Sequence, residues 1–455
     1  MLIFEEEFEA PAAPGHRDLL NHFSSALRFR FSDATIPVRF AITRSSAERY
    51  HCEIGILKGL DPSLSDRPDS IFRFVPRKIE NTANFNAVFL VPTGIGAHIG
   101  GHAGDAGPTA KLLSETCDVL VTHPNVVNAS DINEIPENAL YVEGSVICRL
   151  LMGTVGLRPV RANRVLVIID AHRDELFVNA AINAVSAARA SYGLQCPSVV
   201  QLDPPLQMKS SYTSSGRAAG EIEGLDRLCA VLDEHEGKFD AVAISSVIDV
   251  PPEFHADYFE SHGDMINPWG GVEAMLTHAV SSLFNVPSAH SPMFESRDIA
   301  NIDPGIVEPR MAAEAVSLTF FQCILKGLQR SPRIIADQDA MNHHGALTAA
   351  DISCLVIPDG CVGLPTLAAL EQGIPVIAVR ENKNVMRNDL SALPWTPEQL
   401  HIVDNYWEAV GVMTALKAGI PPSAVRRPLA ATEVKKTTRT KKWLTPGKGQ
   451  SATTG

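Results

Sequence analysis

The sequence lacks any long uninterrupted run of hydrophobic residues. No apolar stretch approaches the roughly eighteen residues that a membrane-spanning helix needs. The chain begins MLIFEEEFEA, which is acidic where a signal peptide would be basic. Hydrophobic content of 45% with 20% charged residues is that of an ordinary globular protein. We therefore expect a cytoplasmic protein without a membrane partner.

Cysteines are too scattered to form a recognisable cluster. The eight cysteines include no pair in CxxC spacing, which argues against a disulfide framework and against a zinc knuckle. No GK[ST] phosphate loop is present either. The sequence predicts no metal site, because no spacing of histidines and carboxylates requires one, and no cofactor is evident.

Charge is distributed unevenly along the chain. The net charge is −13, yet residues 426–448 hold eight Lys and Arg against one Glu. The rest of the chain is therefore more acidic than the whole, which argues against nucleic acid as the main ligand. The basic end, residues 421–455, has the composition of a disordered tail. We favour a solubilising role for this tail over a specific contact with a polyanion.

Hydrophobic patterning predicts an α/β fold with two Rossmann-like, mostly parallel sheets. Residues 26–58 alternate in the manner of β-strands and indicate a small N-terminal β-rich domain over 1–84. From residue 85 onward, apolar strands without alternation are separated by loops and helices, which is typical of parallel sheets covered on both faces. We expect a glycine-loop domain over 85–160, a second Rossmann-like domain over 161–420 and the tail over 421–455.

The stretch VPTGIGAHIGGHAGD, residues 91–105, connects a predicted strand to a predicted helix. It matches a dinucleotide fingerprint poorly, because the next strand ends at His123 rather than at an acidic residue. A phosphate or carboxylate cradle and a purely structural turn are both consistent with it. Asp105 is placed to orient a ligand hydroxyl, to act as a base or to cap the helix. Close backbone approach to a ligand is offered by Gly94, Gly96, Gly100 and Gly101.

The next two strands also end in polar side chains. His123 closes a strand because Pro124 keeps it out of the helical region, and strand ends are where α/β enzymes keep catalytic groups. Asn125 and Asn128 follow in the same loop, and Glu143 ends the next strand. Since the carboxyl ends of parallel strands share one edge of a sheet, we expect these side chains to lie together. The alternative for His123 is a loop histidine satisfied by the backbone.

The second half of the chain contributes further candidates. The segment DGCVGLPTLAALEQGIPVIAVREN follows a predicted strand and opens a predicted helix. A thiol beside a helix N-terminus has a depressed pKa, which makes Cys361 a candidate nucleophile or proton-transfer base. A buried cysteine that fills a turn is the alternative interpretation. Substrate-binding roles are expected for five other residues: His290, Asp359, Gly360, Thr366 and Glu381.

Four motifs are similar to those of an uncharacterised bacterial family that is mainly cyanobacterial. They are VPTGIGAHIGGHAGDA at 91–106, THPNVVN at 122–128, YVEG at 141–144 and AVREN at 378–382. The resemblance spans roughly residues 85–420. It implies one common site without naming a reaction, and it groups Asp105, His123, Asn125, Asn128, Glu143 and Glu381.

Two local resemblances imply chemistry. CVGLPTLAALEQGIPVI is similar to the second cysteine loop of the aspartate/glutamate racemase superfamily, which implies an acid–base or nucleophilic thiol at Cys361. Where that superfamily has its first cysteine, this chain has His123. LEQGIPVIAVREN is similar to the C-terminal domain of sugar-nucleotide epimerases and two-domain glycosyltransferases, although DGCVGLP stands where their phosphate loop is expected.

These patterns predict an enzyme that acts on a small anionic metabolite, a carboxylate or a phosphate, in a cleft between domains. Proton transfer at carbon, as in an isomerase, racemase or decarboxylase, is assigned to Cys361 and His123, with Asp105 and Glu143 positioning them. The alternatives are a nucleotide-sugar epimerase or glycosyltransferase, and a metabolite-binding protein without catalysis. A homo-oligomer is compatible with each of them.

Overall fold

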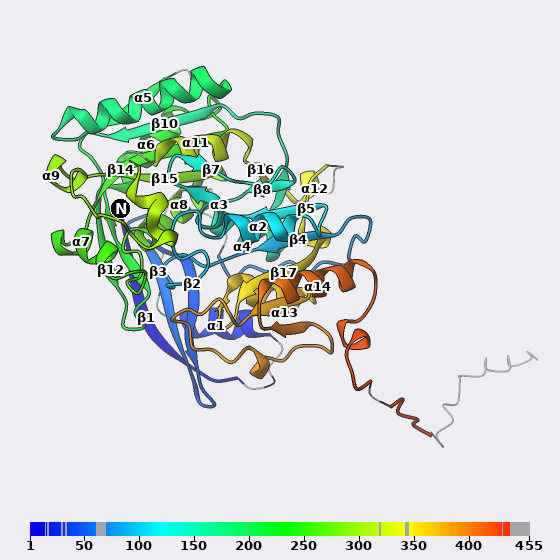
Figure 1. Cartoon of the computed structure of the whole chain (residues 1–455). Coiled ribbons are helices and arrows are strands. Elements are labelled where there is room, and N and C mark those ends of the chain that lie inside the picture. Colours follow the sequence, from blue (N-terminus) through cyan, green and yellow to red (C-terminus); the bar gives the residue numbers. More distant parts are fainter. Residues whose placement is uncertain are drawn as a thin grey trace, which may run out of the picture.

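The computed structural model describes residues 1–13, 15, 18–28, 31, 34–60, 70–196, 198–317, 320–341, 345–429 and 431–436. These residues form a ten-stranded mixed sheet and a six-stranded parallel sheet, together with two short two-stranded pairs (Figure 1). No helix in this part of the chain is both long and apolar enough to cross a membrane.

The six-stranded sheet is parallel throughout, with strand order β20-β19-β17-β4-β5-β8. Strands β4, β17 and β19 are buried along their whole length, which explains their apolar runs without alternation. The chain moves outward from β4 to β5 in one direction and from β17 to β19 in the other, so the topological switch point lies between β4 and β17. The strands are β4 (Asn86–Phe89), β5 (Val119–Thr122), β8 (Ala139–Tyr141), β17 (Ile352–Pro358), β19 (Val376–Val379) and β20 (Leu400–Val403).

The ten-stranded sheet has the order β11-β10-β14-β12-β13-β1-β3-β2-β18, and β15 pairs with β14 outside this path. Its β11-β10-β14-β15 part is parallel, whereas β13, β1, β3, β2 and β18 pair antiparallel. The strands are β1 (Leu2–Pro11), β2 (Thr35–Ser45), β3 (Arg49–Lys58), β10 (Val165–Asp170), β11 (Val199–Leu202), β12 (Gln207–Tyr212), β13 (Ala218–Glu223), β14 (Ala241–Asp249), β15 (Ser288–Met293) and β18 (Val362–Gly363). The short pairs are β6 (Asn128–Ala129) with β7 (Ile132–Asn133), and β9 (Gly156–Arg158) with β16 (Arg333–Ile335).

Helices cover both faces of the parallel sheet. Helix α2 contacts α14, and α4 contacts α13. Because right-handed crossovers leave β4 and β17 in opposite directions, these two pairs lie on opposite faces. The helices are α1 (Leu19–Leu27), α2 (Gly107–Ser114), α3 (Pro124–Val127), α4 (Gly144–Leu151), α5 (Glu175–Tyr192), α6 (Leu225–Glu234), α7 (Pro252–Glu260), α8 (Gly270–Phe284), α9 (Arg297–Ala300), α10 (Ala312–Ala315), α11 (Phe321–Arg330), α12 (Gln338–Met341), α13 (Leu364–Gln372) and α14 (Tyr406–Lys417).

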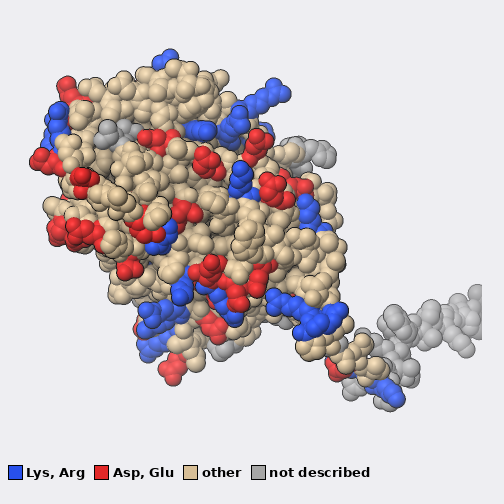
Figure 2. Space-filling model, in the orientation of Figure 1, with Lys and Arg blue, Asp and Glu red and all other residues tan. Residues whose placement is uncertain are grey.

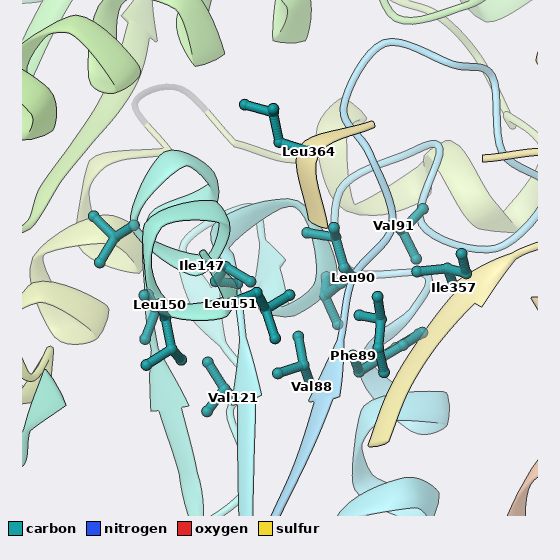
Figure 3. Close-up of a cluster of buried hydrophobic side chains, with 14 of the residues drawn as sticks. Val88, Phe89, Leu90, Val91, Val121, Ile147, Leu150, Leu151, Ile357 and Leu364 are labelled. Carbon is teal, nitrogen blue, oxygen red and sulfur yellow. The ribbon is translucent and has the colours of Figure 1, made fainter. Parts of the chain in front are cut away.

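Aliphatic side chains fill the space between the parallel sheet and helix α4 (Figure 3). Val88 of β4 and Ile147 and Leu150 of α4 are buried in this space, whereas Phe89, the next residue of β4, lies on the other face, where its ring is 5.6 Å from that of Tyr406 in α14. Burying one such side chain contributes about 1.5–3 kcal/mol to folding. The loops that follow β4, β5 and β17 therefore start from a firmly packed base.

Acidic and basic side chains are interspersed on the face that Figure 2 shows. Neither sign forms one continuous patch over the folded body on this face, although the whole chain carries a net charge of −13. Mixed charges of this kind are typical of an ordinary solvated surface.

The predicted α/β class is confirmed, and one of the two predicted sheets is parallel, whereas the ten-stranded sheet is mixed because its N-terminal strands pair antiparallel. The predicted boundaries at residues 85 and 161 do not separate the sheets, because the six-stranded sheet takes strands from 86–141 and from 352–403. The N-terminal strands instead share a sheet with strands from 165–293. A strand pattern identifies a strand but not its neighbours, which explains the difference. The first predicted strand, at 26–32, overlaps the end of α1 and lies partly outside the described residues, as does the tail from 437 onward.

Candidate functional site

A cavity of about 170 Å³ lies where the loops after β4, β5 and β8 face helix α8 and strand β15. We call it the central cavity. It is built at the carboxyl edge of the parallel sheet, which is the expected position for a ligand in this class of fold. Eight residues predicted from the sequence line it: Gly94, Gly96, Gly101, His123, Asn125, Asn128, Glu143 and His290.

The glycine loop, residues 93–105, brings the two sheets together. Gly94 has a φ of +79°, and a Cβ added to it would lie 2.9 Å from the carbonyl oxygen of Ala218 in β13. The N–H of Ala218 donates to the Gly94 carbonyl over 2.8 Å, so only glycine fits this contact. Four amides of the loop are already occupied, including that of Gly100, which was predicted to approach a ligand. N–H groups that already donate to protein oxygens are those of His98, Ile99, Gly100 and Ala103.

His123, directly after β5, is fixed through its ring. The N–H of Val91 donates to Nε2 over 3.1 Å, which assigns the ring proton to Nδ1. Burial lowers the pKa of His123 to about 4, so the ring is neutral at pH 7. Asn125 donates to the carbonyls of Val91 and Gly100 over 3.0 and 2.7 Å and holds the glycine loop against β5. His123 is therefore suited to donate a hydrogen bond rather than to accept a proton.

Glu143 caps helix α4 and pairs with a histidine of helix α8. Its carboxylate accepts the N–H of Ser145 over 2.9 Å and lies 3.0 Å from Nε2 of His278. Burial raises the pKa of Glu143, but the charge and hydrogen bond of His278 and the hydrogen bonds of Ser145 together outweigh burial and lower it. In the neutral form of His278 that keeps Nε2–H directed at Glu143, Nδ1 carries a lone pair; this atom is buried and has no hydrogen-bond partner among the described residues. An unpartnered ring nitrogen held by an ionised carboxylate is suited to accept a proton.

A second glutamate in the same cavity has the reverse environment. Glu314 accepts the N–H of Ala103 over 2.7 Å and a longer contact of 3.3 Å from Nδ2 of Asn267. Burial raises the pKa of Glu314. The hydroxyl of Tyr258 donates to Glu314 and lies 2.7 Å from Nδ1 of His102, which also lines the central cavity. Two carboxyl groups with pKa values pushed in opposite directions form a potential acid–base pair.

Glu273, His290 and Ser246 form another hydrogen-bonded chain. Oε1 of Glu273 lies 2.8 Å from Nδ1 of His290, and Nε2 of His290 lies 2.7 Å from Oγ of Ser246. The order is that of a serine-hydrolase triad, but Ser246 is fully buried, contacts the sulfur of Met208 and does not line the central cavity. A nucleophile must reach its substrate. We therefore interpret Ser246 and His290 as groups that orient Glu273, which does line the cavity.

The central cavity is acidic. Glu143, Glu273 and Glu314 line it, and no Lys or Arg does so within the described residues. A carboxylate or phosphate would meet these carboxylates without a cationic partner, so the lining favours an uncharged or cationic group over the predicted anion. The described part of the chain also contains no group of three histidine, cysteine or carboxylate side chains that could hold a metal ion.

Cys361 lies in a separate pocket of about 130 Å³, which we call the cysteine pocket. His123 and His278 line both spaces. Cys361 is 3% exposed, and burial raises the pKa of its thiol far above the ordinary value. The predicted depressed pKa is therefore not found, because desolvation outweighs the field of helix α13. Thr366 donates to the carbonyl of Cys361 over 2.9 Å and stabilises the start of that helix.

The remaining predicted residues line neither the central cavity nor the cysteine pocket. Asp105 accepts the N–H of Gly100 over 2.8 Å, and burial raises its pKa to about 7. Asp359 accepts the N–H of Gly360 over 2.9 Å in the turn after β17. The side chain of Glu381 is exposed. Each of these groups supports a loop at the carboxyl edge of the sheet.

Several lining residues did not emerge as sequence candidates. Glu273, Thr277 and His278 come from α8, where their spacing of i, i+4 and i+5 places polar groups on one side of an apolar helix. That pattern could have identified them. Glu314 lies in α10, a helix too short to show any period, so no comparable signal was present for it.

Comparison with known proteins identifies a family and a relative. The family model described as "Protein of unknown function (DUF3326)" matches residues 86–426. An uncharacterised lipoprotein of Synechococcus sp. is 32% identical over 346 residues, which cover 75% of this chain and 93% of that protein. No solved structure matches.

Proposed function

The chain belongs to the DUF3326 family of proteins of unknown function, as its motifs predicted, and we propose that it is an enzyme that transfers a proton at a carbon atom of a small molecule bound in the central cavity. Isomerisation and elimination are the reaction classes that begin with this step. The proton acceptor is the pair of His278 and Glu143, and the proton donor is Glu314.

The observation that carries this proposal is the contrast between the two glutamates in one cavity. Glu143 has a lowered pKa because the donors of Ser145 and His278 outweigh its burial, so it is ionised. Glu314 has a raised pKa because it is buried, so it retains a proton more readily. Groups of opposite protonation that face one space permit proton removal and delivery in one catalytic cycle.

Each proton that moves in the proposed step has an acceptor or a donor in the central cavity. Nδ1 of His278 takes a proton from a carbon next to a carbonyl group, while Nε2–H remains directed at Glu143. The electron pair of the broken C–H bond forms a C=C bond, the π electrons of the carbonyl group move onto its oxygen, and the carboxyl group of Glu314 protonates that oxygen to give the enol. The neutral His123 ring, with its proton on Nδ1, is free to donate a hydrogen bond to the same oxygen. Return of the proton to a different carbon, or loss of a leaving group, completes the reaction.

Hydrogen exchange with heavy water tests this step even while the substrate is unidentified. The protein is incubated in D₂O with the small-molecule fraction of a cyanobacterial extract, and the metabolites are then analysed by mass spectrometry. A proton acceptor that exchanges with solvent places deuterium on the reacting carbon, so one metabolite should gain carbon-bound deuterium only when the protein is present.

Two variants make the result specific. Glu143→Gln should abolish the labelling, because it removes the charge that orients His278, while Glu381→Gln changes an exposed carboxylate and serves as the matched control. Labelling that persists in Glu143→Gln would contradict the assigned acceptor. A metabolite that co-purifies with the protein but never gains deuterium would instead favour the non-catalytic alternative.

A further inference from the structure

A second and larger pocket of about 290 Å³ adjoins the central cavity. We call it the apolar pocket. The two spaces share the side chains of Asn128, Asn267, Glu273, His290 and Glu314, so a ligand can extend from one into the other. What this pocket binds bears on the proposed function, because it would hold the part of the substrate that does not react.

The wall beyond the shared residues is mainly hydrocarbon. It includes Ile248 of β14, Trp269 before α8, Met293 at the end of β15 and Ile299 of α9. Val316, which also lines the pocket, is 79% exposed. A roomy apolar pocket beside a few convergent polar groups is the usual form of a small-molecule site. The lining therefore fits an uncharged hydrocarbon body.

Buried polar side chains interrupt this hydrocarbon wall at a few places, and one of them is an imidazole. His255 of α7 is 7% exposed and lines the apolar pocket but not the central cavity. Its Nε2 has no hydrogen-bond partner among the described residues. The nearest carboxylate oxygen, Oε1 of Glu295, lies 3.8 Å away, too far for a direct hydrogen bond, and accepts the N–H of Val250 over 3.1 Å.

The two atoms are too close together to admit an oxygen on the line between them, so an oxygen that bridges them lies beside that line. An oxygen placed about 2.8 Å from each of two atoms that lie 3.8 Å apart makes a hydrogen bond to both. A hydroxyl group fits this position, since it accepts from Nε2–H of His255 and donates to Oε1 of Glu295. An ether oxygen cannot do the same, because it has no proton to donate. The ring of Trp269, 5.3 Å from that of His255, helps to fix the histidine.

We propose that the apolar pocket binds the hydrocarbon body of the substrate and that His255 and Glu295 together recognise a hydroxyl group on that body. Calling this ligand a substrate rests on the proposed function, but its binding does not depend on turnover. The ligand class is an uncharged, hydroxylated hydrocarbon molecule whose reacting end lies in the central cavity.

Binding of two isomeric probes tests this proposal on the full chain. N-phenyl-1-naphthylamine, an uncharged dye that fluoresces in apolar surroundings, reports occupancy of the pocket. Octan-1-ol and 1-methoxyheptane, which have the same composition, are then used to displace it. The alcohol should displace the dye at about tenfold lower concentration than the ether, because one hydrogen bond to a charged group is worth roughly 1.5–3 kcal/mol when fully formed.

Three variants separate the possible outcomes. His255→Phe should still bind the dye but lose the preference for the alcohol, and Ala300→Trp should weaken dye binding at least tenfold by filling the pocket. Glu381→Gln should leave both measurements unchanged, since Glu381 is exposed and lines neither the apolar pocket nor the central cavity. If wild type and His255→Phe prefer the alcohol over the ether to the same extent, the hydroxyl site is overturned, and His255 and Glu295 bind an adventitious water only. Dye binding that survives Ala300→Trp would overturn the pocket assignment, whatever the deuterium experiment gives.

Discussion

The central cavity and the cysteine pocket lie side by side and share His123 and His278, yet their polar groups are organised in different ways. In the central cavity, the pKa values of Glu143 and Glu314 are shifted in opposite directions, and Nδ1 of His278 has no partner in the described part of the chain. In the cysteine pocket, two of the three lining arginines, Arg39 and Arg217, are paired with buried glutamates, and the third, Arg149, donates to the carbonyl of Ser281 over 3.3 Å.

The position of the two spaces in the fold is also informative. The loops after β4 and β17 both line the cysteine pocket, which places it at the topological switch point where a parallel sheet is expected to bind its ligand. In this chain, β18 pairs there with β2 of the other sheet, and Arg39 of β2 lines the pocket. The N-terminal strands thus cover the switch point, and the polar chemistry lies one strand further along, beside β5 and β8. A rule about fold topology locates an edge of the sheet, whereas side-chain chemistry identifies the site.

The largest expected effect tests whether the charges behind the cysteine pocket are structural. Arg217→Met removes a buried cation that contacts both Glu5 and Glu53. Removing one partner of a buried ion pair costs about 3–5 kcal/mol, since it leaves the other charge uncompensated. Urea denaturation should show a loss of this size, whereas Arg49→Met, which breaks the exposed pair with Glu9, should cost less than about 1 kcal/mol. Equal losses in the two variants would remove the distinction between the pockets.

The second largest effect tests whether the proposed proton transfer takes place in the central cavity. Glu143→Gln keeps the size of the side chain but removes the charge that orients His278. We expect deuterium incorporation into the labelled metabolite to fall by about 100-fold, equivalent to roughly 2.7 kcal/mol, because general acid–base groups contribute at least this much. The melting temperature of the variant is the control for folding. A fall of less than about threefold would move the acceptor elsewhere.

A smaller effect concerns the loop that forms one wall of the central cavity. Burial raises the pKa of Asp105 to about 7 from an ordinary value of 3.8. Between these values the unfolded chain loses a proton that the folded chain retains, so stability falls as pH rises from about 4 to 7 and levels off above. Asp105→Asn keeps the oxygen that accepts the Gly100 N–H, and it should remove this slope.

Urea midpoints of wild type and Asp105→Asn at pH 5 and pH 8 measure the effect. Between pH 5 and pH 8 the free energy of unfolding of the variant should rise by on the order of 1 kcal/mol relative to that of wild type. Only the wild type has a buried carboxyl group at this position, and its protonated form is lost as pH rises. Parallel pH dependence in the two proteins would show that Asp105 has an ordinary pKa in the folded chain.

The smallest effect on labelling is expected for Cys361→Ala, which would have the largest effect if the thiol carried out the reaction. Cys361 is buried and its pKa is raised, so it is protonated at neutral pH. Cys361→Ala should change deuterium incorporation by less than about twofold, while the loss of buried volume lowers stability by on the order of 1 kcal/mol. A loss of labelling as large as that of Glu143→Gln would return the chemistry to the cysteine pocket.

Local patterns in the sequence predicted the strand ends better than the contacts between them. His123, Asn125, Asn128 and Glu143 follow two neighbouring parallel strands, so simple alternation of strand and loop was sufficient to bring them together. Cys361 follows an equally clear strand, but the partner that seals its pocket is β2, which lies far away in the sequence. Desolvation of the thiol depends on that distant strand, and no local motif encodes it.

The strands of the two sheets alternate along the sequence, and this order affects how the protein folds during synthesis on the ribosome. Strand β4 pairs on one side with β5, but its other neighbour, β17, begins only at Ile352. Until β17 has been synthesised, the edge of β4 that pairs with it remains exposed. Chains with exposed strand edges are prone to aggregate. Nascent chains that stop short of β17 should depend on chaperones to stay in solution, because the parallel sheet is completed only after residues 352–403 have been synthesised.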